Sequence, residues 1–529
     1  MVPWYEPHEK EGFALVFYGL PGRIVRFAYL RVLLRLLVVV KYLNGWFFEI
    51  RHGKHSVPEP ARGFSLWKAR EHLAEELKQS LMVARVEYAI LSFGHDQQII
   101  IAADDKSQVL SLLKHRFADC KLKNTSHGII ISRLVRATSC RPAMLITSNA
   151  NIQFWNTITT ANVPDPERGC YPVGTKVESI HNPNTYFLTP ASWQSAQQDA
   201  SHVPDTIREP IISKVTFPID VVYTWVDNSD QYWSDRRNAA MRAEYGAIDD
   251  TGTANRRFAS HDELRYSLRS LEFYAGWVNH VYIVTDGQVP SWLNTDNDRV
   301  SVVDHQDIFT DRSVLPVFNS HAIESQLHHI DGLSEHYLYM NDDVFLGQEV
   351  WPETFFEANG LARFFASVVA TIDFNEVLEG NYPLAAAAKS ARKLLQDAFG
   401  VTIIDRFQHT PHPQRRSTLF DMESRWPDLF QKTASHRFRG KDDISFAAYL
   451  HHWYGYCIGE SIPGSVRYSY VKIADANAAR IYRRLQCERN RDVFCLNESD
   501  ALNDMTRRNQ QALTSFLETY YPIASSFEK

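Results

Sequence analysis

The chain has 529 residues, of which 44% are hydrophobic and 22% charged, and its formal net charge is −6. This composition excludes an intrinsically disordered chain. The chain is longer than a domain with one hydrophobic core usually is, so we expect two or three domains. Because the net charge is slightly negative, the chain has no overall positive potential that would attract nucleic acid, and we predict no nucleic-acid partner. Six cysteines lie scattered without a CxxC pair, which predicts reduced thiols and no cysteine zinc site.

The first 56 residues are predicted to form a basic amphipathic segment. Residues 1–22 lack the basic start and apolar core of a secretory signal. Residues 23–50 are apolar but carry five cations, and their longest uncharged run, Tyr42–Phe48, is far shorter than the roughly 20 residues of a spanning helix. The segment suits a helix lying on an anionic membrane surface or one packed on the protein's own core. We therefore expect a cytoplasmic protein, with any membrane contact peripheral and on the inner face.

Residues 57–210 are predicted to form a small accessory α+β domain that follows the linker Val57–Gly63. The hydrophobic pattern predicts helices at residues 64–82 and 108–117, and strands at residues 86–92, 98–102, 128–134 and 143–147. This stretch contains neither a phosphate loop nor a nucleophile motif, so it predicts no activity of its own.

Residues 211–529 are predicted to form the catalytic domain, with a helical insertion near residues 375–430. Short apolar strands alternate with helices in the first half of this domain. The strands are expected at residues 219–225, 281–285, 300–303 and 337–340, and the helices at residues 262–274 and 320–328. This alternation predicts an α/β fold with a mostly parallel, Rossmann-like sheet that is covered on both faces.

Polar residues gather where these strands end. The triplet Asn341-Asp342-Asp343 follows the apolar run Tyr337–Met340, and other strand ends carry Asp227, Asp230 and Asp286. Two adjacent carboxylates cost free energy unless a metal, a cation or a shared proton compensates them. A plain turn would also use Asn and Asp. Because ligands bind beyond the carboxyl ends of parallel strands, the gathering of acids at one edge favours a site.

Four segments in order between about residues 215 and 500 carry recognisable motifs. The first segment is Ile219–Asp227 with Ser229-Asp230, and the second runs from Asp262 through Ile283–Leu293 and Ala322–Ser325 to Asp343. The third comprises His409–His412, Arg415-Arg416, Lys432–Arg439 and Asp443, and the fourth is Phe494–Asn497. Together they resemble the signatures of the Stealth family of sugar-phosphate transferases, which serves microbial capsule and exopolysaccharide synthesis and has the animal Golgi N-acetylglucosamine-1-phosphotransferase as a relative. Glu498 follows where the family commonly has Asp.

This resemblance implies a glycosyltransferase-A-like catalytic fold and a specific reaction. A hydroxyl of an acceptor glycan would attack the β-phosphorus of a UDP-hexose or UDP-N-acetylhexosamine. A sugar-1-phosphate would be transferred in a phosphodiester, and UMP would leave. The alternative is a metal-dependent glycosyltransferase that attacks the anomeric carbon and releases UDP.

The reaction requires a base, charge neutralisation and alignment of the two substrates. Asp343 and His409 are the candidate catalytic residues, with His412 as a competitor for the role of His409. Asp342 is the candidate metal ligand, and oxygen ligands favour Mg²⁺ or Mn²⁺ over Zn²⁺. The candidate substrate-binding residues, which lie within or beside the signatures, are Asp227, Asp230, Arg265, Asn341, Arg416, Arg439 and Asn497.

Overall fold

The computed structural model describes residues 60–93, 96–125, 128–137, 144–160, 163–165, 169–178, 187–198, 212–246, 258, 260–377, 383–498 and 506–529. The basic segment at residues 23–50 lies outside these ranges, so the two interpretations of it stay predictions. The predicted domain limits also stay predictions.

The accessory part is built on a mixed sheet with the strand order β1-β2-β5-β4-β3. Its helices α2 and α3 bury apolar side chains, including Leu73, Leu77 and Leu113, against Ile99 and Ile131 of the sheet. The strands are β1 (Tyr88–Phe93), β2 (Asp96–Ala102), β3 (Cys120–Asn124), β4 (Gly128–Ala137) and β5 (Met144–Thr157), and the helices are α2 (Leu66–Val83) and α3 (Lys106–Arg116). The short elements β6 (Val163–Asp165), β7 (Gly169–Tyr171), β8 (Lys176–Val177), β9 (Phe187–Leu188) and α4 (Pro190–Gln198) follow.

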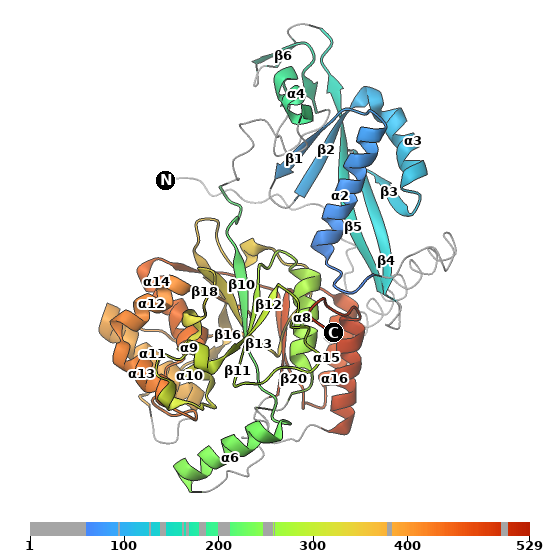
Figure 1. The fold of residues 1–529 in the computed structure, drawn as a ribbon. Helices are drawn as coiled ribbons and strands as arrows, with labels where there is room; N and C mark the ends of the chain where they lie inside the picture. Colours follow the sequence, from blue (N-terminus) through green and yellow to red (C-terminus); the bar gives the residue numbers. More distant parts are fainter. Residues whose placement is uncertain are drawn as a thin grey trace, which may run out of the picture. The chain divides into compact units, whose positions relative to one another are not determined.

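The part of the chain from residue 212 onward is organised around a five-stranded sheet with the order β12-β11-β10-β13-β18 (Figure 1). The four strands β10 (Ile219–Thr224), β11 (Val281–Thr285), β12 (Val300–Asp304) and β13 (His336–Asn341) run parallel. The edge strand β18 (His412–Arg415) pairs antiparallel with β13. The α/β fold with a mostly parallel sheet is therefore confirmed.

Side chains alternate between two separate cores on the two faces of this sheet. Val221 and Tyr223 of β10 enter one core, whereas Val222 between them enters the other. The same alternation separates Leu338 from Tyr339 in β13. Because successive strand residues point to opposite faces, an all-apolar strand requires cover on both sides.

One face is covered by α8 (Glu263–Tyr274), α15 (Ala478–Glu488) and α16 (Arg507–Tyr520), which contribute to the first core. The opposite face is covered by α10 (Ser320–Glu324), α11 (Pro383–Phe399), α12 (Arg416–Arg425), α13 (Pro427–Ser435) and α14 (His451–Ile458). The 3-10 turn η3 (Leu327–His329) and the π-helix η5 (Phe446–Leu450) also lie there. The other α-helices in the described residues of this part are α6 (Gln231–Tyr245) and α9 (His305–Ile308), and the 3-10 turns are η2 (Arg312–Val314) and η4 (Pro352–Thr354).

A second, small sheet extends from the end of β13. It has the order β14-β21-β20, formed by β14 (Val344–Leu346), β21 (Val493–Asn497) and β20 (Tyr468–Lys472). The backbone nitrogen of Leu496 donates to the Asp343 carbonyl over 2.9 Å. The fourth signature is thereby placed beside the acidic triplet, although about 150 residues separate them along the chain. Two-stranded pairs join β15 (Ala362–Phe364) to β19 (Ser461–Pro463) and β16 (Ala366–Thr371) to β17 (Asp405–Phe407).

Most predicted elements are confirmed within one or two residues, and β11 matches its predicted range. The predicted helix at residues 320–328 is divided into α10 and the turn η3. The edge strand β18 was not predicted, because its sequence His-Pro-Gln-Arg has no apolar alternation.

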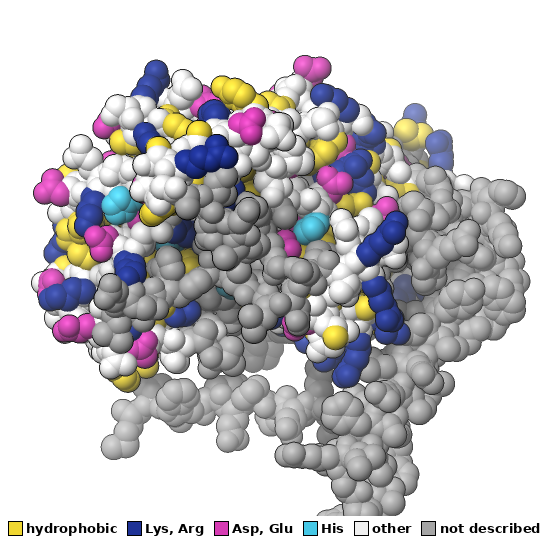
Figure 2. Space-filling model, turned by 90° about the horizontal axis from the view of Figure 1, so that it is seen from below, with side chains coloured by type: hydrophobic (Ala, Val, Ile, Leu, Met, Phe, Trp, Pro, Cys, Tyr) yellow, Lys and Arg dark blue, Asp and Glu magenta, His cyan; other side chains and the backbone are white. Residues whose placement is uncertain are grey.

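The described surface gives no sign of a membrane-spanning element. Among the described residues, no helix is both long and apolar enough to cross a bilayer. On the face shown in Figure 2, basic and acidic side chains are interspersed over much of the described surface. This distribution agrees with the nearly balanced charge of the sequence.

Candidate active site

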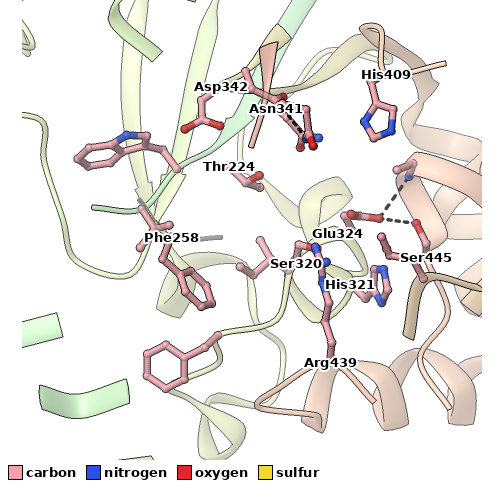
Figure 3. Close-up of a pocket in the computed structure, with 18 of the residues that line it drawn as sticks. Thr224, Phe258, Ser320, His321, Glu324, Asn341, Asp342, His409, Arg439 and Ser445 are labelled. Atoms are coloured by element: carbon pink, nitrogen blue, oxygen red, sulfur yellow. Dashed lines mark hydrogen bonds between the residues drawn. The ribbon is translucent and has the colours of Figure 1, made fainter. Parts of the chain in front are cut away.

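A cavity of about 1100 Å³ lies at the carboxyl ends of β10, β11 and β13 (Figure 3). Residues from all four signature segments line it, among them Thr224, Asn341, His409 and Asn497. Drug-sized ligands usually occupy about 300–1,000 Å³, so this cavity has room for a nucleotide-sugar. The cavity lies beyond the strand ends, where the sequence predicts the site.

Three carboxyl groups meet at the end of β13. Asp342, Asp343 and Glu263, the first residue of α8, all line the cavity. Burial, with Asp343 adding to it, raises the pKa of Glu263 to about 7 despite the opposing charge of His261. Burial and the charges of Glu263 and Asp343 raise the pKa of Asp342 well above its usual range. The cluster therefore attracts a cation or holds a proton near neutral pH.

Asp343 is held at one oxygen and open at the other. Its Oδ2 accepts from Asn497 Nδ2 over 3.0 Å and from Cys495 Sγ over 3.3 Å. Asn497 is held in turn by the Tyr470 hydroxyl, which donates to Asn497 Oδ1 over 2.8 Å. Asp343 Oδ1 is buried and has no hydrogen-bond partner among the described residues. An unpaired buried carboxylate oxygen fits a proton or a divalent cation.

The acidic end of the cavity continues into a histidine–glutamate pair. His261 Nε2 lies 3.2 Å from Glu498 Oε2, and this contact is the main cause that raises the pKa of His261. Glu498 lines the cavity, so an acidic group is retained where the family commonly has the shorter Asp.

The two candidate histidines have different surroundings. His409 is exposed at the cavity wall, where its ring lies 5.2 Å from that of Tyr470 and its backbone nitrogen donates to the Tyr468 hydroxyl over 3.2 Å. His412 also lines the cavity, but its Nδ1 lies 3.0 Å from His452 Nε2. Burial lowers the pKa of His412 to about 3, with His409 and His451 adding to the effect. His409 is thus the better placed of the two to contact a ligand.

The part of the cavity away from the acids is basic and aromatic. Arg439 donates to Ser320 Oγ over 2.7 Å, and both residues face the cavity in Figure 3. Arg237 of α6 is only 5% exposed, and its guanidinium lies 4.8 Å from the ring centroid of Phe258. Guanidinium groups bind phosphate with two hydrogen bonds, and aromatic rings offer a stacking surface for a base.

Two buried polar residues in the cavity wall were not singled out from the sequence. Glu324 of α10 accepts from Ser445 Oγ over 2.9 Å and from the backbone nitrogen of Ala448 over 3.3 Å (Figure 3). His321 Nδ1 lies 3.2 Å from Asp443 Oδ2. Glu324 lies within the quoted second signature, but sequence position alone did not separate it from an ordinary helix residue. Arg237, described above, lies in no motif that was quoted from the sequence, so no pattern indicated it as a site residue.

Asp227 and Asp230 are not among the residues that line the cavity, and the structure gives both a local structural role. Asp227 Oδ1 accepts from the backbone nitrogen of Ser229 over 2.9 Å. Asp230 is the N-cap of α6, and its side chain accepts from the backbone nitrogens of Tyr232 and Trp233. The prediction that they bind substrate is corrected accordingly, because turn and cap contacts occupy their carboxylates.

Arg265 and Arg416 also lie outside the cavity lining. Arg265 Nε donates to Glu528 Oε2 over 2.5 Å. Arg416 donates to three backbone carbonyls, those of His328, Ile330 and Leu333, over 2.7–3.1 Å. Both guanidinium groups therefore stabilise the fold, and their predicted role in phosphate binding is wrong. Arg439, Asn341, Asn497, Asp342, Asp343 and His409 are brought together in the cavity as predicted.

Comparison with solved structures finds glycosyltransferases, but at low similarity. The galactosyltransferase LgtC, in complex with donor and acceptor sugar analogues, is 12% identical with a TM-score of 0.29, over 57% of this chain and 96% of that one. The glycosyltransferase GlyE of Streptococcus pneumoniae is 10% identical with a TM-score of 0.26, over 58% and 62%. These scores are too low to support an argument.

Comparison with curated proteins finds much closer relatives. An exopolysaccharide phosphotransferase of Streptomyces coelicolor is 42% identical over 72% of this chain and 40% of its own length. A second from the same organism is 40% identical over 72% and 64%. The exopolysaccharide phosphotransferase CpsY of Mycobacterium tuberculosis is 37% identical over 61% and 60%. The chain thus spans less than two thirds of the length of these relatives.

Four family models match in the order of the predicted signatures. They are Stealth protein conserved region 1 at residues 217–245, conserved region 2 at 257–364, conserved region 3 at 408–456 and conserved region 4 at 483–529. All four regions contribute residues to the same cavity. The chain belongs to the Stealth family.

Proposed function

We propose that this protein transfers a sugar-1-phosphate from a UDP-sugar to a hydroxyl of an acceptor glycan in exopolysaccharide or capsule synthesis. The acceptor oxygen forms a bond to the β-phosphorus, the bond between the β-phosphorus and the bridging oxygen breaks, and UMP leaves with that oxygen. The observation that carries the proposal is the shared cavity, in which three carboxyl groups, His409 and Arg439 meet. The names of the relatives, exopolysaccharide phosphotransferases, support the same class of reaction.

Asp343 and His409 serve the acceptor hydroxyl in this proposal. Asn497 and Cys495 orient Asp343 through Oδ2, which leaves Oδ1 to accept the hydroxyl proton or to anchor the hydroxyl. His409 is exposed to the cavity and contacts the same hydroxyl or the transferred phosphate.

Arg439 and Arg237, two of the three arginines in the described cavity wall, hold the diphosphate. The aromatic residues beside them, Phe258 and Trp233, provide an apolar surface for the nucleoside. The donor is a UDP-hexose or a UDP-N-acetylhexosamine.

Asp342, with Glu263, would hold Mg²⁺ or Mn²⁺. These residues fit such an ion because they offer oxygen ligands only, and because burial, with the charges of neighbouring carboxylates adding to it, raises the pKa of both. When bound, the ion supplies positive charge that stabilises the diphosphate and the leaving phosphate. Chelation with EDTA is expected to abolish transfer, and Mg²⁺ or Mn²⁺ to restore it.

The decisive experiment identifies the nucleotide that is released. The full chain is incubated with a panel of UDP-sugars and glycan acceptors, and the products are separated by chromatography. We expect UMP from the wild type, and from Asp343→Asn a rate lower by at least about 100-fold. Asp227→Asn is the matched control, because it changes a carboxylate outside the cavity. Release of UDP instead of UMP would establish the alternative, a glycosyltransferase.

The protein is further proposed to act in the cytoplasm, with residues 23–50 resting on the inner face of the membrane. The five cations of this segment motivate the proposal. Flotation with vesicles containing anionic lipid, compared with neutral vesicles, tests it. Equal flotation with both kinds of vesicle, or none with either, would contradict it.

A further inference from the structure

Two histidines and a glutamate form a compact cluster outside the active-site cavity. His328 and His329 belong to the turn η3, and Glu423 belongs to α12. The Nε2 atoms of both histidines lie 2.9 Å from the same oxygen, Glu423 Oε2. Each residue offers one ligand atom, and these three atoms all lie within 4.8 Å of one another. None of the three residues lines the cavity described above.

The hydrogen bonds of His329 do not suit a neutral imidazole in this cluster. Its Nδ1 lies 3.1 Å from the carbonyl oxygen of Ile308, which only accepts, so Nδ1 must carry a proton. Neutral His329 then directs the lone pair of Nε2 at the Glu423 carboxylate. This repulsive contact is relieved either by protonating the ring or by placing a cation between the two groups. A metal-bound histidine typically donates its other ring N–H to a backbone carbonyl, as His329 does.

His328 and Glu423 are already in the charge states that bind metal. Burial lowers the pKa of His328 to about 4, so its ring is neutral at neutral pH. Its Nε2 faces the Glu423 carboxylate, which only accepts, so the proton of the neutral ring lies on Nε2. Its Nδ1 has no hydrogen-bond partner among the described residues and can take that proton when a metal binds at Nε2. Burial alone would raise the pKa of Glu423, but the hydrogen bonds from both histidines outweigh it and lower the pKa to about 2. Glu423 is therefore a carboxylate.

We propose that His328, His329 and Glu423 bind a zinc ion, separate from the magnesium or manganese ion proposed for the active site. Two imidazoles and one carboxylate form a known zinc ligand set, in which water takes the fourth position. Glu423 is 26% exposed, which gives the ion and the water access. Tetrahedral zinc with these bond lengths sets its ligand atoms about 3.3 Å apart. The present contacts of 2.9 Å need to open by only a few tenths of an ångström.

The position of the site implies a structural role. The turn η3 follows α10, which carries His321 and Glu324 into the cavity wall, and α12 directly follows β18 at the edge of the central sheet. A zinc ion would therefore join two segments that border the active site. Arg416, which donates to the His328 carbonyl, is the nearby cation that would weaken binding.

Zinc binding is tested on the full chain by equilibrium dialysis and metal analysis. The protein is first stripped with EDTA and then dialysed against zinc chloride in an excess of magnesium chloride. We expect the wild type to bind one more equivalent of zinc than His329→Gln or Glu423→Gln. His115→Ala, which changes an exposed histidine of α3, is the control and should bind as the wild type does. Zinc should also raise the melting temperature of the wild type by several degrees but leave both variants unchanged.

A second measurement does not depend on how the variants fold. Cobalt added to the stripped wild type should give the intense visible absorption of a tetrahedral ion, and zinc should abolish it. Equal zinc content in the wild type and both variants would overturn the proposal, as would the absence of this cobalt absorption. Either result would leave His329 as a protonated ring that forms an ion pair with Glu423.

Discussion

Replacing Glu263 by Gln tests the electrostatic account of the carboxyl cluster. Glu263 is 6% exposed and lies beside Asp342 and Asp343 in the cavity wall. Burial raises its pKa from 4.5 to about 7. The folded protein therefore disfavours the charged form, and the glutamine, which has the same shape, removes that charge.

The size of the effect follows from this pKa. Each pKa unit corresponds to about 1.4 kcal/mol of free energy, so a rise of the pKa from 4.5 to about 7 lowers the stability of the folded, charged form by about 3 kcal/mol. Since the folded pKa lies above the unfolded value, the cost is absent below about pH 4.5, grows as the pH rises, and is complete above about pH 7. Glu263→Gln should thus be more stable than the wild type at about pH 8.5 but nearly equal at about pH 4.5.

The assay is thermal unfolding of both proteins in EDTA at these two pH values. We expect the melting temperature of Glu263→Gln to exceed that of the wild type by several degrees at the higher pH only. Glu528→Gln is the control of opposite sign. Although burial alone would raise the pKa of Glu528, hydrogen bonds from Arg269 and Arg265 outweigh it and lower the pKa to about 2. Its contribution is present above about pH 4.5 and lost only as the pH falls towards 2, so this variant should be less stable than the wild type at both pH values.

Two results would refute the reasoning. One is a Glu263→Gln protein that is less stable than the wild type at about pH 8.5. The other is a difference between the two proteins that does not change with pH. Adding Mg²⁺ should reduce the advantage of the variant, because a bound cation compensates the same charge.

Three other predictions concern neighbouring residues. Asn497→Ala removes the amide that orients Asp343, so we expect kcat to fall about tenfold with little change in KM, as steady-state kinetics would show. Asp230→Ala removes the N-cap of α6 and should lower the free energy of unfolding by about 1 kcal/mol in urea titration, with a much smaller loss of activity than Asp343→Asn. His409→Ala should reduce transfer by at least about 100-fold, whereas His412→Ala should mainly lower the melting temperature, and the reverse pattern would exchange their roles.

Much of the fold was predictable because local patterns and tertiary contacts agree. The apolar runs of β10, β11 and β13 are buried on both faces, as a parallel sheet between two helical layers requires. The strand β18 was missed because its polar residues pair at a sheet edge. Its existence depends on the hydrogen bonds offered by β13 rather than on its own sequence.

Part of the candidate site was predictable because some of its residues directly follow a predicted strand. Asn341-Asp342-Asp343 follows a strand directly, so its position at the sheet edge followed from the chain order. Arg265 and Arg416 lie equally close to the signatures but bind Glu528 and backbone carbonyls. Which partner a guanidinium contacts depends on the direction of its side chain, and sequence position does not give that direction.

The sequence by itself determined the family, the mostly parallel sheet and the grouping of Asp342, Asp343, His409, Arg439 and Asn497, which line one cavity. Motif order and apolar strand patterns are properties that can be read directly from the linear sequence. Only the tertiary structure decided three groups of contacts. Glu263 lies close enough for its charge to act on Asp342, Asn497 donates to Asp343, and His328 and His329 lie beside Glu423. Each of these contacts joins residues at least about 75 positions apart, and burial and hydrogen bonding between such residues are set by how the elements pack.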